Sequence, residues 1–113
     1  MNLASVVEKL KLRVACGQGG LERPVRGGYA GDLLSDVLAN SSEGDLWITR
    51  QNHQNIVAVS SLKDHAGILL VQGKEPEADT LEKAVKEGIP ILVTELTTFE
   101  IAGRLHRLLH GPS

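Results

Sequence analysis

The sequence has few aromatic residues and no marked excess of either charge. Its 113 residues include one Phe, one Trp and one Tyr, and 12 Lys plus Arg against 14 Asp plus Glu give a net charge of -2. Domains that bind nucleic acid usually carry a basic face, and those that bind single strands add aromatic side chains on which bases stack. We therefore expect no nucleic-acid partner.

Cysteines and long apolar runs are scarce as well. Cys16 is the only cysteine, so a disulfide within the chain is excluded and a reducing compartment is expected. The longest apolar runs, Gly67 to Val71 and Ile89 to Val93, are far shorter than the roughly 20 residues that span a bilayer. Met1 to Leu12 carries charges within its apolar pattern, unlike the centre of a signal peptide. We expect a soluble, cytoplasmic protein with no membrane partner.

The apolar segments that are present alternate with longer segments of helical pattern. A chain of this length suffices for one domain and buries roughly two thirds of its unfolded surface. Its apolar segments are Leu46 to Thr49, Gly67 to Val71 and Pro90 to Thr94. Parallel strands need long crossovers, whose helices cover the faces of the sheet. The spacing predicts one α/β domain over residues 1–113, with three layers, a mainly parallel sheet and helical crossovers.

Helices are predicted from apolar residues at helical spacing. They cover Asn2 to Leu10, Asp32 to Asn40, Asn55 to Leu62, a segment from Asp79 to Gly88, and a last segment from Thr97 to Gly111. Asn55 to Leu62 is rich in β-branched residues, but a crossover is required there. Leu12 to Cys16 and Pro24 to Tyr29 are predicted as further strands, the second at an edge because proline cannot donate to a ladder.

Capping patterns mark the ends of the last two helices. Thr97 and Glu100 form a capping box, and Asp79 with Glu82 resembles one. Gly88 stands where a left-handed residue would end its helix. We expect Val85 and Phe99 on the buried faces of these helices.

Polar residues that follow parallel strands converge on one edge of a sheet. Here they are Thr49, Arg50, Gln51, Asn52, His53, Gly73, Lys74, Thr97 and Thr98. They supply cations, amides and an imidazole beside a helix N-terminus, which suits a phosphate or nucleotide. The competing interpretation is that Asn52 caps a helix and the remainder is solvated loop. Gly17 to Gly20 lacks the Lys-Ser/Thr ending of a phosphate loop and is interpreted as a turn.

No catalytic residue, metal ligand or cofactor is predicted. His53 would act as a general base only with a positioned partner, and none can be named. His106 and His110 are four apart, but Arg107 stands where a zinc-protease motif has Glu, and no third ligand is evident. Asp32 and Asp36 are expected on one helix face, as solvated acidic side chains. The pattern favours a protein that is not an enzyme.

Several stretches together resemble a known family. They include Gly27-Gly28-Tyr29, Asp32 to Val37, Gly44 to Thr49, Asn55 to Val59, Ala66-Gly67-Ile68, Gly88 to Ile91 and Thr98-Phe99-Glu100. The sequence from Arg26 to Leu105 is similar to the stand-alone DRTGG-domain proteins. The resemblance implies an α/β domain similar to the N-terminal domain of HPr kinase/phosphorylase and to the DRTGG regulatory domain of CBS-containing pyrophosphatases, where the domain contributes to dimerisation.

The letters of the family name are not present as a string. Arg50-Gln51-Asn52 stands where the Asp-Arg-Thr portion would fall, and Gln72-Gly73-Lys74 where the later glycine turn would fall. The resemblance implies a non-catalytic regulatory or assembly module, acting as a homodimer, that binds a small anionic ligand such as a nucleotide. Alternatives are a small phosphotransfer enzyme using His53 or a Thr, or a structural partner in a redox complex of the hydrogenase type.

Overall fold

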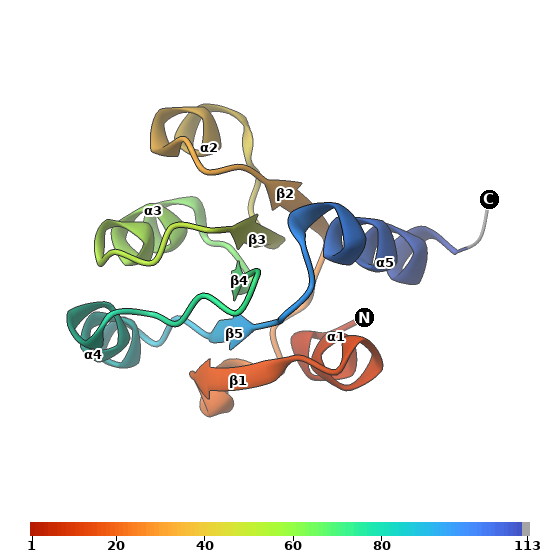
Figure 1. Cartoon of the computed structure of the whole chain (residues 1–113), viewed down its shortest axis with the longest axis horizontal. Coiled ribbons are helices and arrows are strands. Elements are labelled where there is room, and N and C mark those ends of the chain that lie inside the picture. Colours follow the sequence, from red (N-terminus) through yellow and green to blue (C-terminus); the bar gives the residue numbers. More distant parts are fainter. Residues whose placement is uncertain (112–113) are drawn as a thin grey trace.

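The computed structural model describes residues 1–111, in which a sheet lies between two layers of helices (Figure 1). The strands are β1 Arg13–Cys16, β2 Gly27–Ala30, β3 Asp45–Thr49, β4 Gly67–Leu70 and β5 Ile91–Val93. The helices are α1 Leu3–Leu10, the 3-10 turn η1 Gln18–Gly20, α2 Leu34–Asn40, α3 Asn55–Lys63, α4 Ala78–Glu87 and α5 Thr98–His110. The predicted α/β fold with a mainly parallel sheet is confirmed.

The sheet order is β1-β5-β4-β3-β2. Strands β2 to β5 are parallel, with Trp47 paired to Ile68 and Leu69 to Leu92, whereas β1 runs antiparallel to β5. Consequently the ends of β2, β3, β4 and β5 and the start of β1 lie at one edge, which we call the carboxyl-end edge. The helical crossover α3 forms despite its β-branched residues because β3 and β4 are parallel neighbours.

Each face of the sheet has its own apolar core. Helices α1 and α5 cover one face, where Leu46, Leu69 and Leu92 of the sheet share a buried apolar cluster with Leu3 and Leu105 of these helices. Helices α2, α3 and α4 cover the other face through a second buried cluster, which includes Val37, Trp47, Ile56, Ile68 and Ala84. Since β3 and β4 are buried on both faces, all of their residues are buried.

Side-chain caps are confirmed at α1 and α5. The Asn2 side chain accepts a hydrogen bond from Ser5 N, and Thr97 Oγ1 accepts one from Glu100 N. Gly88 ends α4 with a left-handed φ of 72°. The other predicted N-terminal caps were wrong. Asp79 lies inside α4, which begins after Glu77, and α3 begins after Gln54 rather than at Asn52.

Three further side chains differ from the predicted positions. Val85 is 62% exposed and Phe99 is 89% exposed, because each lies on the side of its helix away from the sheet. Asp32 precedes α2, which starts at Leu34, so Asp32 and Asp36 do not share a helix face. Within residues 1–111, no helix combines the length and the apolar character that crossing a membrane requires.

Candidate functional site

Hydrogen bonds join the three loops that leave β3, β4 and β5 at the carboxyl-end edge. Asn52 Nδ2 donates to Glu75 O at 2.8 Å, and Thr80 Oγ1 donates to Asn52 O at 2.8 Å. Gln72 N donates to Leu96 O and Gly73 N to Thr94 O. The structure therefore brings the three predicted site segments, 49–53, 73–74 and 97–98, to one edge.

Asp32 is the residue at this edge that the sequence interpretation missed. Its Oδ1 accepts hydrogen bonds from Thr49 Oγ1 and from Arg50 N, both at 2.8 Å, and its carbonyl accepts one from Gln51 Nε2 at 3.0 Å. Asp32 follows β2, which is also parallel to β3. The other site residues were selected because they follow parallel strands. The same criterion would have included Asp32, had Pro24 to Tyr29 been predicted as a parallel strand.

His53 has the carboxylate partner that the sequence did not reveal. Its Nδ1 lies 2.9 Å from Glu77 Oε1, the residue just before α4. The two side chains are 61% and 46% exposed, so this attraction is screened by solvent and contributes little to stability.

Most of the predicted site side chains already have structural partners. Thr49 bonds to Asp32, Asn52 joins two loops, and Thr97 caps α5. Arg50 and Lys74 are exposed, and within residues 1–111 neither forms an ion pair. These two cations are the members of the predicted set that remain available to an anionic ligand.

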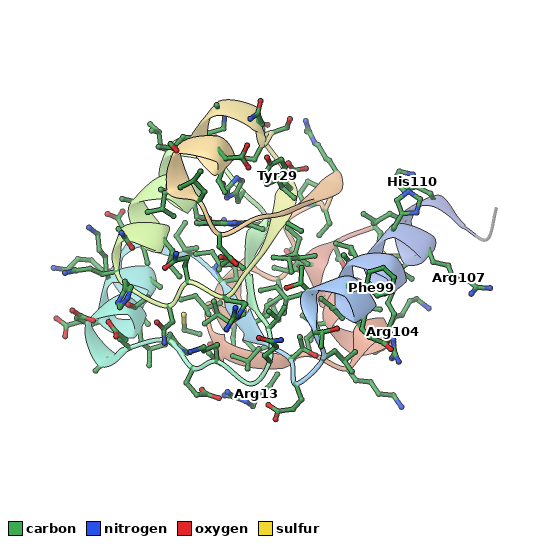
Figure 2. All side chains as sticks on the ribbon, turned by 45° about the horizontal axis from the view of Figure 1, so that its top comes forward. Arg13, Tyr29, Phe99, Arg104, Arg107 and His110 are labelled. Carbon is green, nitrogen blue, oxygen red and sulfur yellow. The ribbon has the colours of Figure 1, made fainter. Side chains whose placement is uncertain are left out.

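A second group of cations lies at the same edge, around a cavity of about 440 Å³ between β5, β1, the end of α1 and the middle of α5. We call this cavity the basic cleft. Among residues 1–111, its charged lining consists of Lys9, Lys11, Arg13, Arg104 and the carboxylate Glu95. Arg13 comes from β1 and Arg104 from α5 (Figure 2). Its volume falls within the range of small-molecule sites.

Sequence reasoning missed the basic cleft because the direction of β1 was unknown. Antiparallel pairing of Arg13 with Val93 places the start of β1 beside the end of β5. Lys11 ends α1 in a left-handed conformation with φ 55°, which turns the chain into β1. The pattern Lys9-x-Lys11-x-Arg13 was the available signal.

Two arginines of the basic cleft also contact carboxylates. Arg13 forms an ion pair with Glu75 of the β4–α4 loop, and Arg104 Nε lies 3.5 Å from Glu100 Oε2 within α5. All four side chains of these pairs are more than half exposed, so water screens both pairs. An incoming phosphate can therefore displace either carboxylate from its guanidinium at little cost in free energy.

The thiol Cys16 lies away from this edge and is 4% exposed. Burial raises its pKa, and its Sγ contacts Ile89 O at 3.5 Å. A thiolate is the nucleophilic form of cysteine, so burial keeps this group in its unreactive form.

Comparison with known proteins identifies relatives of the whole domain. The DRTGG domain model matches residues 5–108. A phosphate acetyltransferase of Acinetobacter baylyi is 34% identical over 89 residues, which cover 65% of this chain and 12% of that protein. The chain thus corresponds to a small part of that enzyme.

A solved structure has a similar fold. It contains the CBS and DRTGG domains of the regulatory region of Clostridium perfringens pyrophosphatase, complexed with the activator diadenosine tetraphosphate. The TM-score is 0.72 at 19% identity, over 96% of this chain and 46% of that one. At this identity the likeness establishes the fold.

Proposed function

The chain belongs to the DRTGG domain family, and from this premise we propose that it is a non-catalytic regulatory or assembly module, acting as a homodimer, that binds a small anionic ligand such as a nucleotide. The observation that carries the ligand part of the proposal is the basic cleft, where four cations surround a cavity of about 440 Å³. The similar pyrophosphatase region is regulatory and was obtained with a dinucleotide activator.

In this proposal the phosphates of the ligand enter the basic cleft. Lys9 and Lys11 come from the end of α1, and Arg13 and Arg104 approach from β1 and α5. A guanidinium group can donate two parallel hydrogen bonds to the oxygens of one phosphate, and each lysine adds a point charge. Arg50 and Lys74, farther along the carboxyl-end edge, would bind a second phosphate or a polar head group of an extended ligand.

The remaining predicted site residues have a supporting role in the proposal. Asn52 joins the loops after β3 and β4, and Gly73 N bonds to Thr94 O beside the cleft residue Glu95. A Cβ on Gly73 would lie 2.7 Å from Glu95 Oε2. The Glu95 carboxylate therefore lies against the turn at Gly73, where a side chain larger than that of glycine would displace it.

Thermal shift measurements test the ligand part. The probes are ATP, diadenosine tetraphosphate and inorganic phosphate, each at millimolar concentration. A ligand that binds only the folded state must raise the melting temperature. We expect a nucleotide to raise it in wild type, with a smaller rise at high salt because the cations are exposed. Isothermal titration calorimetry then gives the dissociation constant.

Variants locate the binding site. The double variant Lys9→Ala with Arg104→Ala removes two cleft cations and is expected to abolish the nucleotide-induced shift. Lys86→Ala on α4 removes an exposed cation from the opposite layer and serves as the matched control. An unchanged nucleotide shift in the double variant, or no shift with any probe in wild type, would contradict the proposed site.

A further inference from the structure

We propose that two copies of this chain pair through their α5 helices, in antiparallel orientation, with the two-fold axis beside Gly103. The inference rests on the homodimer of the proposed function and names its interface. The surface is the α5 outer face, which consists of Phe99, Gly103, His106, Arg107 and His110, all of them exposed. Figure 2 shows Phe99, Arg107 and His110 along this helix.

Phe99 is the largest apolar side chain that the described residues leave almost wholly exposed, at 89%. It lies at the start of a helix that buries Ile101 and Leu105 on its opposite side. A shallow hollow of about 840 Å³ adjoins it, and its lining includes Phe99, Ala102, Gly103, Arg104, Arg107 and the carboxylate Glu100. An aromatic side chain beside an apolar hollow, bordered by arginines, is the composition typical of interface centres.

Among residues 1–111, no steric contact or left-handed φ requires glycine at position 103. Glycine is a poor helix former, yet it occupies the middle of α5, and a Cβ added there would meet no heavy atom within 4 Å. Its φ is not in the left-handed region. A glycine on an exposed helix face lets a second backbone approach closely, which is a function that only a partner helix would use.

Charge and sequence symmetry select a second copy as the occupant. An antiparallel two-fold axis at Gly103 places each residue before it opposite the residue equally far after it. Phe99 then faces Arg107 of the second copy, and Glu100 faces its His106 and lies beside its Arg107. Arginine over an aromatic ring is attractive, and the Glu100 carboxylate meets positive charge. Each contact occurs twice, as an isologous interface requires.

A parallel arrangement of the same helices lacks this complementarity. It would place Arg107 opposite Arg107 and Glu100 opposite Glu100, so that like charges meet. In the antiparallel arrangement opposite charges of the two α5 helices attract each other, whereas in the parallel arrangement like charges repel each other. A single pair of helix faces is a small interface, so we expect a dimer whose population depends on protein concentration.

Sedimentation equilibrium over a range of concentrations measures the assembly. For wild type we expect a mass that rises from 12.1 kDa toward twice that value. Gly103→Lys places two ammonium groups at the axis and is expected to raise the dissociation constant by at least about thirtyfold, as loss of an interface hot spot does. Its melting temperature at low concentration should not fall, because lysine is the better helix former. Gly19→Lys, at an equally open position away from α5, is the control.

Cross-linking tests the antiparallel orientation. Gly103→Cys lies on the axis, so two copies should form a disulfide with each other under mild oxidation. Phe99→Cys alone should cross-link poorly, whereas a mixture of Phe99→Cys and Arg107→Cys chains should form the heterodisulfide. Efficient Phe99→Cys homodisulfide and no mixed product would overturn the orientation.

Two other results would overturn the interface itself. One is a wild-type mass of 12.1 kDa at several hundred micromolar, and the other is a dimer that Gly103→Lys leaves intact. Neither bears on the basic cleft, whose nucleotide-induced thermal shift is measured separately. Absence of that shift in a wild-type chain that dimerises through α5 would overturn the ligand proposal alone.

Discussion

Thr49 Oγ1 donates a hydrogen bond to Asp32 Oδ1 at 2.8 Å, and this bond joins the ends of β2 and β3. Thr49 is 1% exposed, so its hydroxyl depends on this acceptor. The same carboxylate oxygen accepts a hydrogen bond from Arg50 N. Asp32 thereby fixes the start of the loop after β3, which carries the predicted site residues Arg50, Gln51, Asn52 and His53.

We expect Asp32→Ala to lower the free energy of unfolding by about 1–3 kcal/mol, because it leaves a buried hydroxyl and a backbone N–H without their acceptor. Urea denaturation measures the loss. Asp32→Asn keeps an acceptor oxygen and should lose less. Asp79→Ala, an exposed carboxylate inside α4, is the control and should change stability by no more than about 0.5 kcal/mol. Equal unfolding midpoints for Asp32→Ala and wild type would contradict the assigned role.

His65 is expected to make stability depend on pH. His65 is 1% exposed, and its Nε2 lies 2.9 Å from Ser41 Oγ. Because Ser41 Oγ donates to Val37 O, His65 Nε2 carries the proton and donates to Ser41. Within residues 1–111, His65 Nδ1 has no hydrogen-bond partner, so protonation would bury a donor without an acceptor. Burial lowers the pKa of His65, Asp45 opposes this shift, and Lys63 adds to it.

The sign of the pH effect follows from this lowered pKa. Above the ordinary value of 6.5, the imidazole is neutral in both states, and its contribution is constant. As the pH falls below 6.5, the unfolded chain takes up a proton that the folded chain does not, so stability decreases. Urea denaturation between neutral pH and pH 5 should show this decrease in wild type and a smaller one in His65→Gln. His110→Gln, at an exposed position, should retain the wild-type dependence, and a flat profile in wild type would contradict the prediction.

Gly17 cannot accept a side chain, whereas the nearby Gly19 can. Gly17 has a φ of 85°, and a Cβ there would lie 2.4 Å from Pro90 Cα. We expect Gly17→Ala to lower the free energy of unfolding by about 2–4 kcal/mol, through the left-handed conformation and the backbone overlap. Gly19→Ala meets open space and should change stability by less than about 1 kcal/mol, in the stabilising direction. Thermal and urea denaturation compare the two, and equal stabilities would show that the β1–η1 turn adapts.

The strands and helices with a strong local sequence pattern were predictable from the sequence. The unbroken apolar runs of β3 and β4 reflect burial on both faces, and the caps Asn2 and Thr97 are local hydrogen bonds between near neighbours. The crossover α3 was predicted against its composition because parallel strands need a long connection. These features depend on residues close together in the chain.

Only the tertiary structure decided which way an element faces and what lies beside it. Helical spacing predicted the buried stripe of α5 but wrongly included Phe99 in it. A residue in the first turn can lie on either face of the helix, and packing against the sheet decides which face is buried. His53 and Glu77 are 24 residues apart, and Asp32 and Thr49 are 17 apart.

The basic cleft shows the same division. Lys9, Lys11 and Arg13 are visible as an alternating basic pattern, but their meeting with Arg104 depends on β1 running antiparallel to β5. The sequence by itself determined the strands, the crossovers and the edge at which polar residues gather, because periodicity and connection length are local constraints. The partners of those residues across the edge were decided by strand order and direction, which arise from long-range packing that no single segment encodes.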